Sequence, residues 1–594
     1  MSGPRAAQAP DTPHVLRELA FVADGERGAI LGPAGAVEWL CFPRWEDGAV
    51  FQPLVGGPGR FHVRPVGRFV WGGCYEEGTL IWRDRWVTDD GAVVECRAAL
   101  ALPGRADRAV LLRRVEVRGG DCPIDVLLAP HPDYGRAAVR SWHRQDDGSF
   151  TASAAGVHVR VSGLSRAHDA PDGHGGRMLH QELRLSEGRC HDLVLELASS
   201  AFDDSPPDAD AAWQRTRAEW GHRVPPLEVA TGRRDAAHAC AVLEGLTSTT
   251  GAMMAAATTS LPEHADTGRD YDYRYAWIRD TAIAGQAMAV AAPTAGILDR
   301  WTAFVRDRVL EDGPRLAPAY TTTGGPVPSP RSFGWPGYPG GHDVAGNHVR
   351  KQFQLDSLGE ALLLFAAMGR LERLDADGWR GAEVAADAIA ERWQDPDNGF
   401  WELDERWWTE SRLTCVAGLR AMAALGGAGP VVRRWTSLAD ALSAEVARRA
   451  VHGEGRLQRA DDDERVDAAL LLAIVRGGLA ADDPRARRTL EAVKRELVVD
   501  GYCYRYQPDE RPLGEAEGAF LFCGFVLSLA EMAQGDHVAG ARWFERTRAS
   551  CGPPGLFSEE FDVDERQLRG NLPQAFVHGL LLEAAARQEA SPLP

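Results

Sequence analysis

Hydrophobic and polar positions along this chain follow two different periods, and the period changes near residue 205. Before that point, short runs alternate apolar and polar residues between Gly/Asp turns, as at 110–118, 157–161 and 183–186. Such alternation is typical of strands with one buried face, and many strands at short spacing favour a β-sandwich. We therefore expect an N-terminal β-sandwich over residues 1–205.

The second part of the chain has a helical period. The stretch D-S-P-P-D-A-D-A-A-W-Q-R-T-R-A-E-W predicts a linker with one helix over 206–235, followed by a helical domain over 236–594. The helices expected in this domain span 236–250, 278–292, 295–311, 353–370, 381–393, 409–426, 430–451, 464–477, 484–498, 516–534, 536–550 and 571–587.

The lengths of the connections between these twelve helices alternate. Connections that leave the even-numbered helices are mostly short, whereas those that leave the odd-numbered helices are long and rich in Gly, Pro, Trp and acidic residues. Antiparallel helices joined in this way place every long loop at the same end of the bundle. Six hairpins that close into a ring would form a double-layered α-barrel with the even-numbered helices inside. An open array of hairpins is the alternative.

Composition narrows the class of protein. A chain of 594 residues exceeds one hydrophobic core, so two or more domains are expected. The formal net charge of −19 argues against a nucleic-acid partner. The 10 Cys show no C-x-x-C and no Cys/His cluster, so neither a metal nor another cofactor is expected. No apolar leader or membrane-length segment is visible, so we expect a cytoplasmic protein without a membrane partner. Both a monomer and a homo-oligomer stay open.

Two glutamates stand in separate loops beside aromatic residues. Glu402 lies in G-F-W-E-L at 399–403, before the sixth helix, and Glu559 lies in L-F-S-E-E-F-D at 556–562, before the twelfth. In a six-hairpin ring these loops face each other across the bowl. Two such carboxylates perform acid/base cleavage of a glycosidic bond, and a separation of roughly 6.5–9.5 Å would leave room for the water of an inverting reaction. Glu560 is the alternative to Glu559.

A dense Arg/Asp/aromatic stretch, R-D-Y-D-Y-R-Y-A-W-I-R-D, fills 269–280. Arg279 and Asp280 are suited to bonding adjacent hydroxyls of a pyranose, and Trp277 offers a face for stacking on the sugar. The alternative is that Arg–Asp pairs merely hold the loop to the barrel. This alternative stays open for Arg269, Asp270, Asp272 and Arg274.

These motifs occur together in an order that resembles glycoside hydrolase family 15, the glucoamylases, glucodextranases and bacterial trehalase-like enzymes. The resemblance covers nearly the whole chain. It rests on the stretch at 272–280 and on S-E-E-F-D, together with G-A-I-L-G-P-A-G-A-V-E-W-L-C-F-P-R-W at 28–45, G-N-H-V-R-K-Q-F-Q-L-D at 346–356, D-N-G-F-W-E at 397–402, E-G-A-F-L-F-C at 517–523 and G-N-L-P-Q-A-F at 570–576. It implies a β-sandwich followed by an (α/α)6 barrel, and inversion at the anomeric carbon.

The resemblance also implies roles for seven residues. Glu402 would be the general acid, and Glu559 would be the general base that stays ionised. The residues implied to bind the sugar are Trp277, Arg279, Asp280, Trp401 and Arg505. We therefore expect an exo-acting α-glucosidase that releases β-D-glucose from a small carbohydrate substrate of the trehalase or glucoamylase type.

Three positions depart from the family pattern. Val344 precedes Ala345-Gly346-Asn347 where a P-V-R-x-G-N motif is usual, and Leu403-Asp404 replaces V-R after the first glutamate. These changes leave both glutamates intact but bear on the choice of substrate. A carbohydrate phosphorylase of similar architecture and a non-catalytic sugar-binding protein are the alternative functions.

Overall fold

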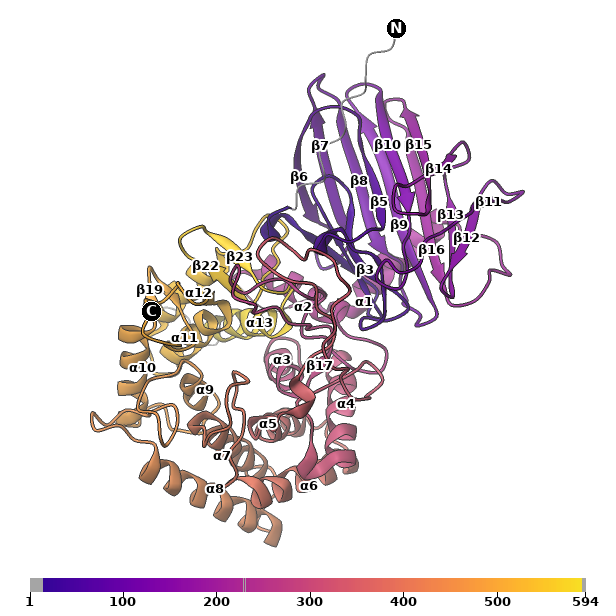
Figure 1. The fold of residues 1–594 in the computed structure, drawn as a ribbon. Coiled ribbons are helices and arrows are strands. Elements are labelled where there is room, and N and C mark those ends of the chain that lie inside the picture. The colour runs from indigo at the N-terminus through magenta and orange to yellow at the C-terminus, as the bar shows by residue number, and fades with distance from the viewer. Residues whose placement is uncertain (1–13, 228, 230, 590–594) are drawn as a thin grey trace.

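The computed structural model describes residues 14–227, 229 and 231–589, in which a β-rich part leans against a ring of helices (Figure 1). Two antiparallel sheets, with strand orders β11-β12-β13-β16-β9-β8-β7-β6 and β14-β15-β10-β5, share one core. The strands predicted at 110–118, 157–161 and 183–186 lie in β9, β13 and β15, so the sandwich is confirmed. The strand bounds are β5 (Arg60–Pro65), β6 (Phe69–Tyr75), β7 (Trp82–Thr88), β8 (Val93–Leu100), β9 (Arg108–Arg118), β10 (Cys122–Ala129), β11 (His143–Arg144), β12 (Phe150–Ala154), β13 (Val157–Ser162), β14 (His168–Pro171), β15 (Arg177–Leu185) and β16 (Cys190–Ala198).

A third sheet lies between the sandwich and the helices. It contains β1 (Ala20–Ala23), β2 (Gly28–Leu31), β3 (Val37–Cys41) and β4 (Ala49–Phe51). Alternate residues of β1 enter different cores: Ala20 and Val22 pack in the sandwich core, and Phe21 and Ala23 pack in the helical core. Because both faces are buried, β1 is apolar throughout and lacks the alternation of a half-exposed strand.

Within the described part of the chain, twelve helices form two concentric layers after α1 (Ala209–Arg223), which lies in the predicted linker. Each inner helix contacts the next, and the last contacts the first, so the ring is closed and the even-numbered helices of the prediction lie inside (Figure 1). The inner helices are α3 (Ile278–Ala291), α5 (Asp356–Arg370), α7 (Thr409–Ala423), α9 (Leu470–Val475), α11 (Leu521–Ala533) and α13 (Ala575–Glu589). The outer helices are α2 (Arg233–Gly245), α4 (Ile297–Asp312), α6 (Ala376–Arg392), α8 (Pro430–Arg449), α10 (Pro484–Glu496) and α12 (His537–Arg548). The (α/α)6 barrel is therefore confirmed.

One inner helix is much shorter than predicted. The periodicity predicts a helix over 464–477, but α9 spans only Leu470–Val475. The preceding residues bind neighbouring loops instead: Asp467 Oδ1 accepts from Trp401 Nε1 at 2.7 Å, and Ala468 N donates to the carbonyl oxygen of Arg505 at 2.9 Å. These tertiary bonds take the place of the first helical turns.

Short strand pairs join the long loops at one end of the barrel. Two of these are the pairs β17 (Ala276–Trp277) with β18 (Ala319–Tyr320) and β19 (Val498–Val499) with β20 (Tyr502–Cys503). The third is a sheet in the order β21 (Ala519–Phe520), β22 (Glu560–Asp562) and β23 (Gln567–Arg569). Pairing of β21 with β22 delays the start of α11 to Leu521, where the sequence predicts residue 516. Among the described helices, none combines the length and apolar character that crossing a membrane requires.

Candidate functional site

The long loops enclose a pocket of about 390 Å³ at the loop end of the barrel. Its walls come from the connections that precede α3, α5, α7, α11 and α13. This volume lies within the range of roughly 300–1,000 Å³ that is usual for small-molecule sites. From α3, Arg279 and Asp280 line the pocket, and the helix is buried from Ile278 to Met288.

Glu402 lies in a tight loop with a strained backbone. Its φ is +59°, a value that a residue with a long side chain seldom adopts and that concentrates at functional sites. Asn398 closes the loop, because its Nδ2 donates to the carbonyl oxygen of Leu403 at 2.8 Å. Gly399, with a φ of +67°, is required here, since a Cβ at this position would lie 2.8 Å from the ring of Trp408.

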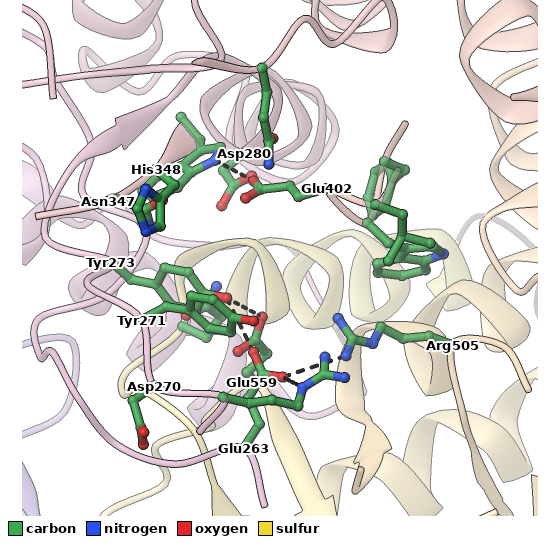
Figure 2. A pocket seen from close by; sticks show the side chains of 18 of the residues that line it. Glu263, Asp270, Tyr271, Tyr273, Asp280, Asn347, His348, Glu402, Arg505 and Glu559 are labelled. Atoms are coloured by element: carbon green, nitrogen blue, oxygen red, sulfur yellow. Dashed lines mark hydrogen bonds and ion pairs between the residues drawn. The ribbon is translucent and has the colours of Figure 1, made fainter. Parts of the chain in front are cut away.

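Two donors orient the carboxyl group of Glu402. Trp277 Nε1 donates to Glu402 Oε1 at 2.6 Å, and Arg279 Nη2 donates to the same oxygen at 3.4 Å. The side chain of Glu402 is still 22% exposed and reaches the pocket (Figure 2). The carboxyl group is therefore fixed in direction yet accessible to a ligand.

Glu559 lies on the opposite wall and is almost completely buried. The hydroxyl of Tyr273 donates to Glu559 Oε1 at 3.1 Å, and Oε2 has no hydrogen-bond partner among the described residues. Burial raises the pKa of Glu559 well above its ordinary value, and the nearby carboxyl group of Glu263 adds to this effect. The expectation that Glu559 stays ionised did not include this rise in pKa, because neither the burial of Glu559 nor the carboxyl group beside it can be read from the sequence.

A buried cluster of charged groups surrounds Glu559. Arg269 Nε donates to Glu263 at 2.7 Å, Arg505 Nη2 donates to Glu517 at 2.6 Å, and Arg505 lies 3.4 Å from Glu560. With Glu559, the cluster holds four carboxyl groups and two guanidinium groups, so full ionisation would leave a charge of two minus in a buried region. Such a cluster favours retention of a proton on one of its carboxyl groups.

Glu402 and Glu559 lie on opposite sides of the pocket (Figure 2). Trp277 binds Glu402 and Tyr273 binds Glu559, and the two rings meet edge to face with centroids 5.6 Å apart. This arrangement keeps the carboxyl groups apart, on opposite sides of one cavity. It matches the geometry that the loop order predicts.

The other predicted sugar-binding residues also line this pocket. Arg279 Nη1 donates to Gln354 at 2.9 Å, and the guanidinium group lies over the ring of Phe400. Burial raises the pKa of Asp280 to about 6. Trp401 is fixed by its bond to Asp467, and Arg505 faces the pocket while its guanidinium group is bound to Glu517. Their roles in binding sugar stay predictions.

The alternative reading of the Arg/Asp stretch is confirmed for one pair only. Asp272 and Arg274 form a completely buried ion pair at 2.7 Å, in which Asp272 accepts from the backbone N–H of Gly346 in the loop before α5 and Arg274 donates to the carbonyl oxygen of Trp45 in the N-terminal domain. Arg269 lines the pocket and binds Glu263, and Asp270 lies 3.0 Å from His342. These two residues belong to the rim of the pocket.

Some pocket residues were not predicted from the sequence. Tyr273 is one of them, although its place between two charged residues in an extended stretch is a signal for an inward side chain. Glu263, in L-P-E-H, carries no such signal. Of the three departures from the family pattern, Val344 and Leu403 line the pocket, whereas Asp404 is exposed and its carbonyl oxygen accepts from Trp408.

The described residues contain no group of three or more His, Cys, Asp or Glu side chains that is suited to holding a metal ion.

Comparison with known proteins supports the same interpretation. Residues 242–586 match the family model described as glycosyl hydrolases family 15, and residues 8–220 match the model described as trehalase-like, N-terminal. The trehalase of Mycobacterium tuberculosis is 30% identical over 96% of this chain and 89% of its own length. The trehalase of Mycolicibacterium smegmatis is also 30% identical, over 96% of this chain and 90% of its own length. A bacterial glucoamylase, solved in complex with acarbose, superposes with a TM-score of 0.74 at 15% identity and covers 99% of this chain and 96% of its own, which shows the shared fold.

Proposed function

We propose that this chain, which belongs to glycosyl hydrolases family 15, is an inverting, exo-acting α-glucosidase for small saccharides. It is a glycoside hydrolase, and the observation that carries the finer proposal is the opposition of Glu402 and Glu559 across one pocket (Figure 2). Carboxyl groups on opposite sides of a sugar can serve as acid on one face and base on the other. The pocket ends on the buried first turn of α3, which favours a terminal sugar over the middle of a chain.

In the proposed reaction, Glu402 protonates the glycosidic oxygen as the bond to the anomeric carbon breaks. Glu559 removes a proton from a water molecule that attacks the same carbon from the other face, so the α-linkage yields β-D-glucose. Arg279 and Asp280 would bind hydroxyls of the terminal sugar, and Trp277 and Trp401 would shape the wall around it. Tyr273 would hold the base in position through its 3.1 Å bond to Glu559.

The substrate class is proposed from the relatives. The two bacterial relatives that match this chain over nearly its whole length are trehalases, so α,α-trehalose is the first candidate. Val344 and Leu403 occupy the pocket wall where the family pattern differs, and they make α-1,4- and α-1,6-linked disaccharides worth testing as well.

A panel of glucose-release assays tests this proposal. We expect free glucose from at least one of the α,α-1,1-, α-1,4- and α-1,6-linked glucose disaccharides, with trehalose preferred, because the pocket holds an acid and a base for water attack. The products are identified with and without added inorganic phosphate. Free glucose alone supports hydrolysis, whereas a sugar phosphate formed only with phosphate would support a phosphorylase.

A non-catalytic sugar-binding function makes a different prediction. Titration calorimetry with trehalose and maltose would then show binding, while no disaccharide of the panel would be cleaved. Binding together with cleavage excludes that alternative.

A further inference from the structure

We propose that the β-sandwich positions both catalytic glutamates, through Arg274 as the positioning residue. This inference rests on the proposed function, since it concerns Tyr273 and Trp277, the side chains that hydrogen-bond Glu559 and Glu402. The sandwich would thus help to determine the geometry of the active site.

Arg274 is completely buried where the sandwich meets the barrel, and it is bound from both sides. On the barrel side, its Nε and Nη2 donate to the two carboxylate oxygens of Asp272 at 2.8 and 2.7 Å. On the side of the N-terminal domain, its Nη1 donates to the carbonyl oxygen of Trp45, between β3 and β4, at 3.0 Å, and its Nη2 donates to the hydroxyl of Tyr134, which follows β10 of the sandwich, at 3.0 Å. A guanidinium group with this many fixed acceptors cannot shift without leaving donors unpaired in a buried region.

Successive side chains of this segment point to opposite sides. Arg274 enters the sandwich, whereas Tyr273 lines the pocket and reaches Glu559. Trp277, three residues after Arg274, donates to Glu402. Because Tyr273 and Arg274 are adjacent along the backbone, a displacement of Arg274 must move the hydroxyl that holds the base.

The same anchor reaches a second wall of the pocket. Asp272 Oδ2 accepts from the backbone N–H of Gly346 at 2.8 Å, and the carbonyl oxygen of Asp272 accepts from Asn347 Nδ2 at 3.1 Å. Gly346 and Asn347 both line the pocket. The buried Asp272–Arg274 pair therefore fixes two parts of the pocket. One is the segment that contains Tyr273 and Trp277, which bind the glutamates, and the other is the loop that contains Gly346 and Asn347.

The sandwich residue that completes the anchor has a strained backbone. Tyr134 has a φ of +53°, as does Asp133, and neither is glycine. Its ring stacks on Phe333 of the loop before α5 with centroids 3.9 Å apart, and its carbonyl oxygen accepts from Trp335 Nε1 at 3.1 Å. Such strain persists only where the surroundings hold the residue in place, and it concentrates at functional positions.

A matched pair of hydroxyl deletions in the full-length chain tests the proposal. Tyr134→Phe removes the acceptor for Arg274 but keeps the ring that stacks on Phe333. Tyr75→Phe is the control: it also removes a hydroxyl of the N-terminal domain close to the barrel, since Tyr75 binds the backbone of Phe21 and its ring contacts His238, and none of these three residues lines the pocket. We expect Tyr134→Phe to lower kcat about tenfold or more, with KM little changed, because small displacements of catalytic groups have large effects on rate.

The pH profile separates positioning from loss of folding. If Tyr273 is displaced, Glu559 loses the hydroxyl group that donates to it, and the pKa of Glu559 rises further. The acidic limb of the kcat/KM profile should therefore move to higher pH in Tyr134→Phe but not in Tyr75→Phe. Arg274→Lys keeps the charge that faces Asp272 but not the fork of donors, and it should shift the limb in the same direction. Rates are expressed per folded molecule, measured by circular dichroism.

Equal kcat and equal profiles in Tyr134→Phe and Tyr75→Phe would overturn the proposal. A loss of activity in Tyr134→Phe and Arg274→Lys that is proportional to the loss of folded protein, with an unshifted acidic limb of the pH profile, would also overturn it. Either result, together with inactive variants of Glu402 and Glu559, would refute the role of the sandwich and leave the proposed function standing.

Discussion

Replacement of Glu559 by Gln is expected to lower kcat by about 10²- to 10⁴-fold, the contribution of a well-placed general base. The amide keeps the size of the side chain and still accepts from the hydroxyl of Tyr273, which binds Glu559 at 3.1 Å, but it cannot take a proton from water. Sugar binding should persist, and titration calorimetry with trehalose should show it.

Glu560→Gln is the matched control, one residue further along the chain. Glu560 is fully buried and accepts from the backbone N–H of Gly518 at 2.7 Å, a bond that the amide oxygen of Gln can also accept. We expect a much smaller loss of kcat than for Glu559→Gln. A near-normal rate in Glu559→Gln would remove Glu559 from the base role, and a collapse confined to Glu560→Gln would assign that role to Glu560.

The unmodified protein should show an acidic limb of activity at an unusually high pH for a carboxylate base. Burial and the nearby Glu263 raise the pKa of Glu559, so its ionised, active form is lost as the pH falls through that raised value. Activity should therefore rise with pH beyond the range in which an exposed Glu is already ionised. The limb should be absent from the residual activity of Glu559→Gln.

Replacement of Glu402 by Gln is expected to have the second large effect, a loss of about 10²- to 10⁴-fold in kcat on disaccharides. The amide keeps an oxygen for Trp277 Nε1 and Arg279 but has no carboxylic proton to give to the leaving sugar. On α-D-glucosyl fluoride, whose leaving group needs no proton, the loss should be much smaller. The measurement is the ratio of the two rates in the variant and in the unmodified protein.

Glu405→Gln provides the control within the same loop. Glu405 is exposed, three residues after Glu402, and should show unchanged rates on both substrates. If Glu402→Gln lost the same factor on the fluoride as on the disaccharide, Glu402 would serve binding or structure, and the acid would have to be sought elsewhere.

The fold was predictable because loop length and hydrophobic period report on the backbone directly. Alternating short and long connections determine which helices lie inside and at which end the loops gather, and this placed Glu402 and Glu559 opposite each other without coordinates. The prediction failed for α9, where the periodic residues before Leu470 bind Trp401 and Arg505 instead of extending the helix. Periodicity cannot show such a competition, because the partners lie in distant loops.

The surroundings of the base were not predictable for a related reason. Glu263 comes from the connection before α3, whereas Arg505 and Glu517 come from the connection before α11, and only the closed ring brings them around Glu559. The expectation that Glu559 stays ionised therefore omitted the two causes that raise its pKa, its burial and the nearby carboxyl group of Glu263. The role of Arg274 was equally hidden, since its partners Trp45 and Tyr134 in the N-terminal domain lie more than a hundred residues away.

The most direct test of the two opposed glutamates is the anomeric form of glucose at the moment of release, followed by proton NMR before mutarotation. Each inverting cleavage of α,α-trehalose yields one β-glucose from the bound sugar and one α-glucose from the leaving sugar, so both anomers should appear in equal amounts from the first spectrum. Initial release of α-glucose alone would mean retention, and would contradict a water activated by Glu559 opposite the acid Glu402.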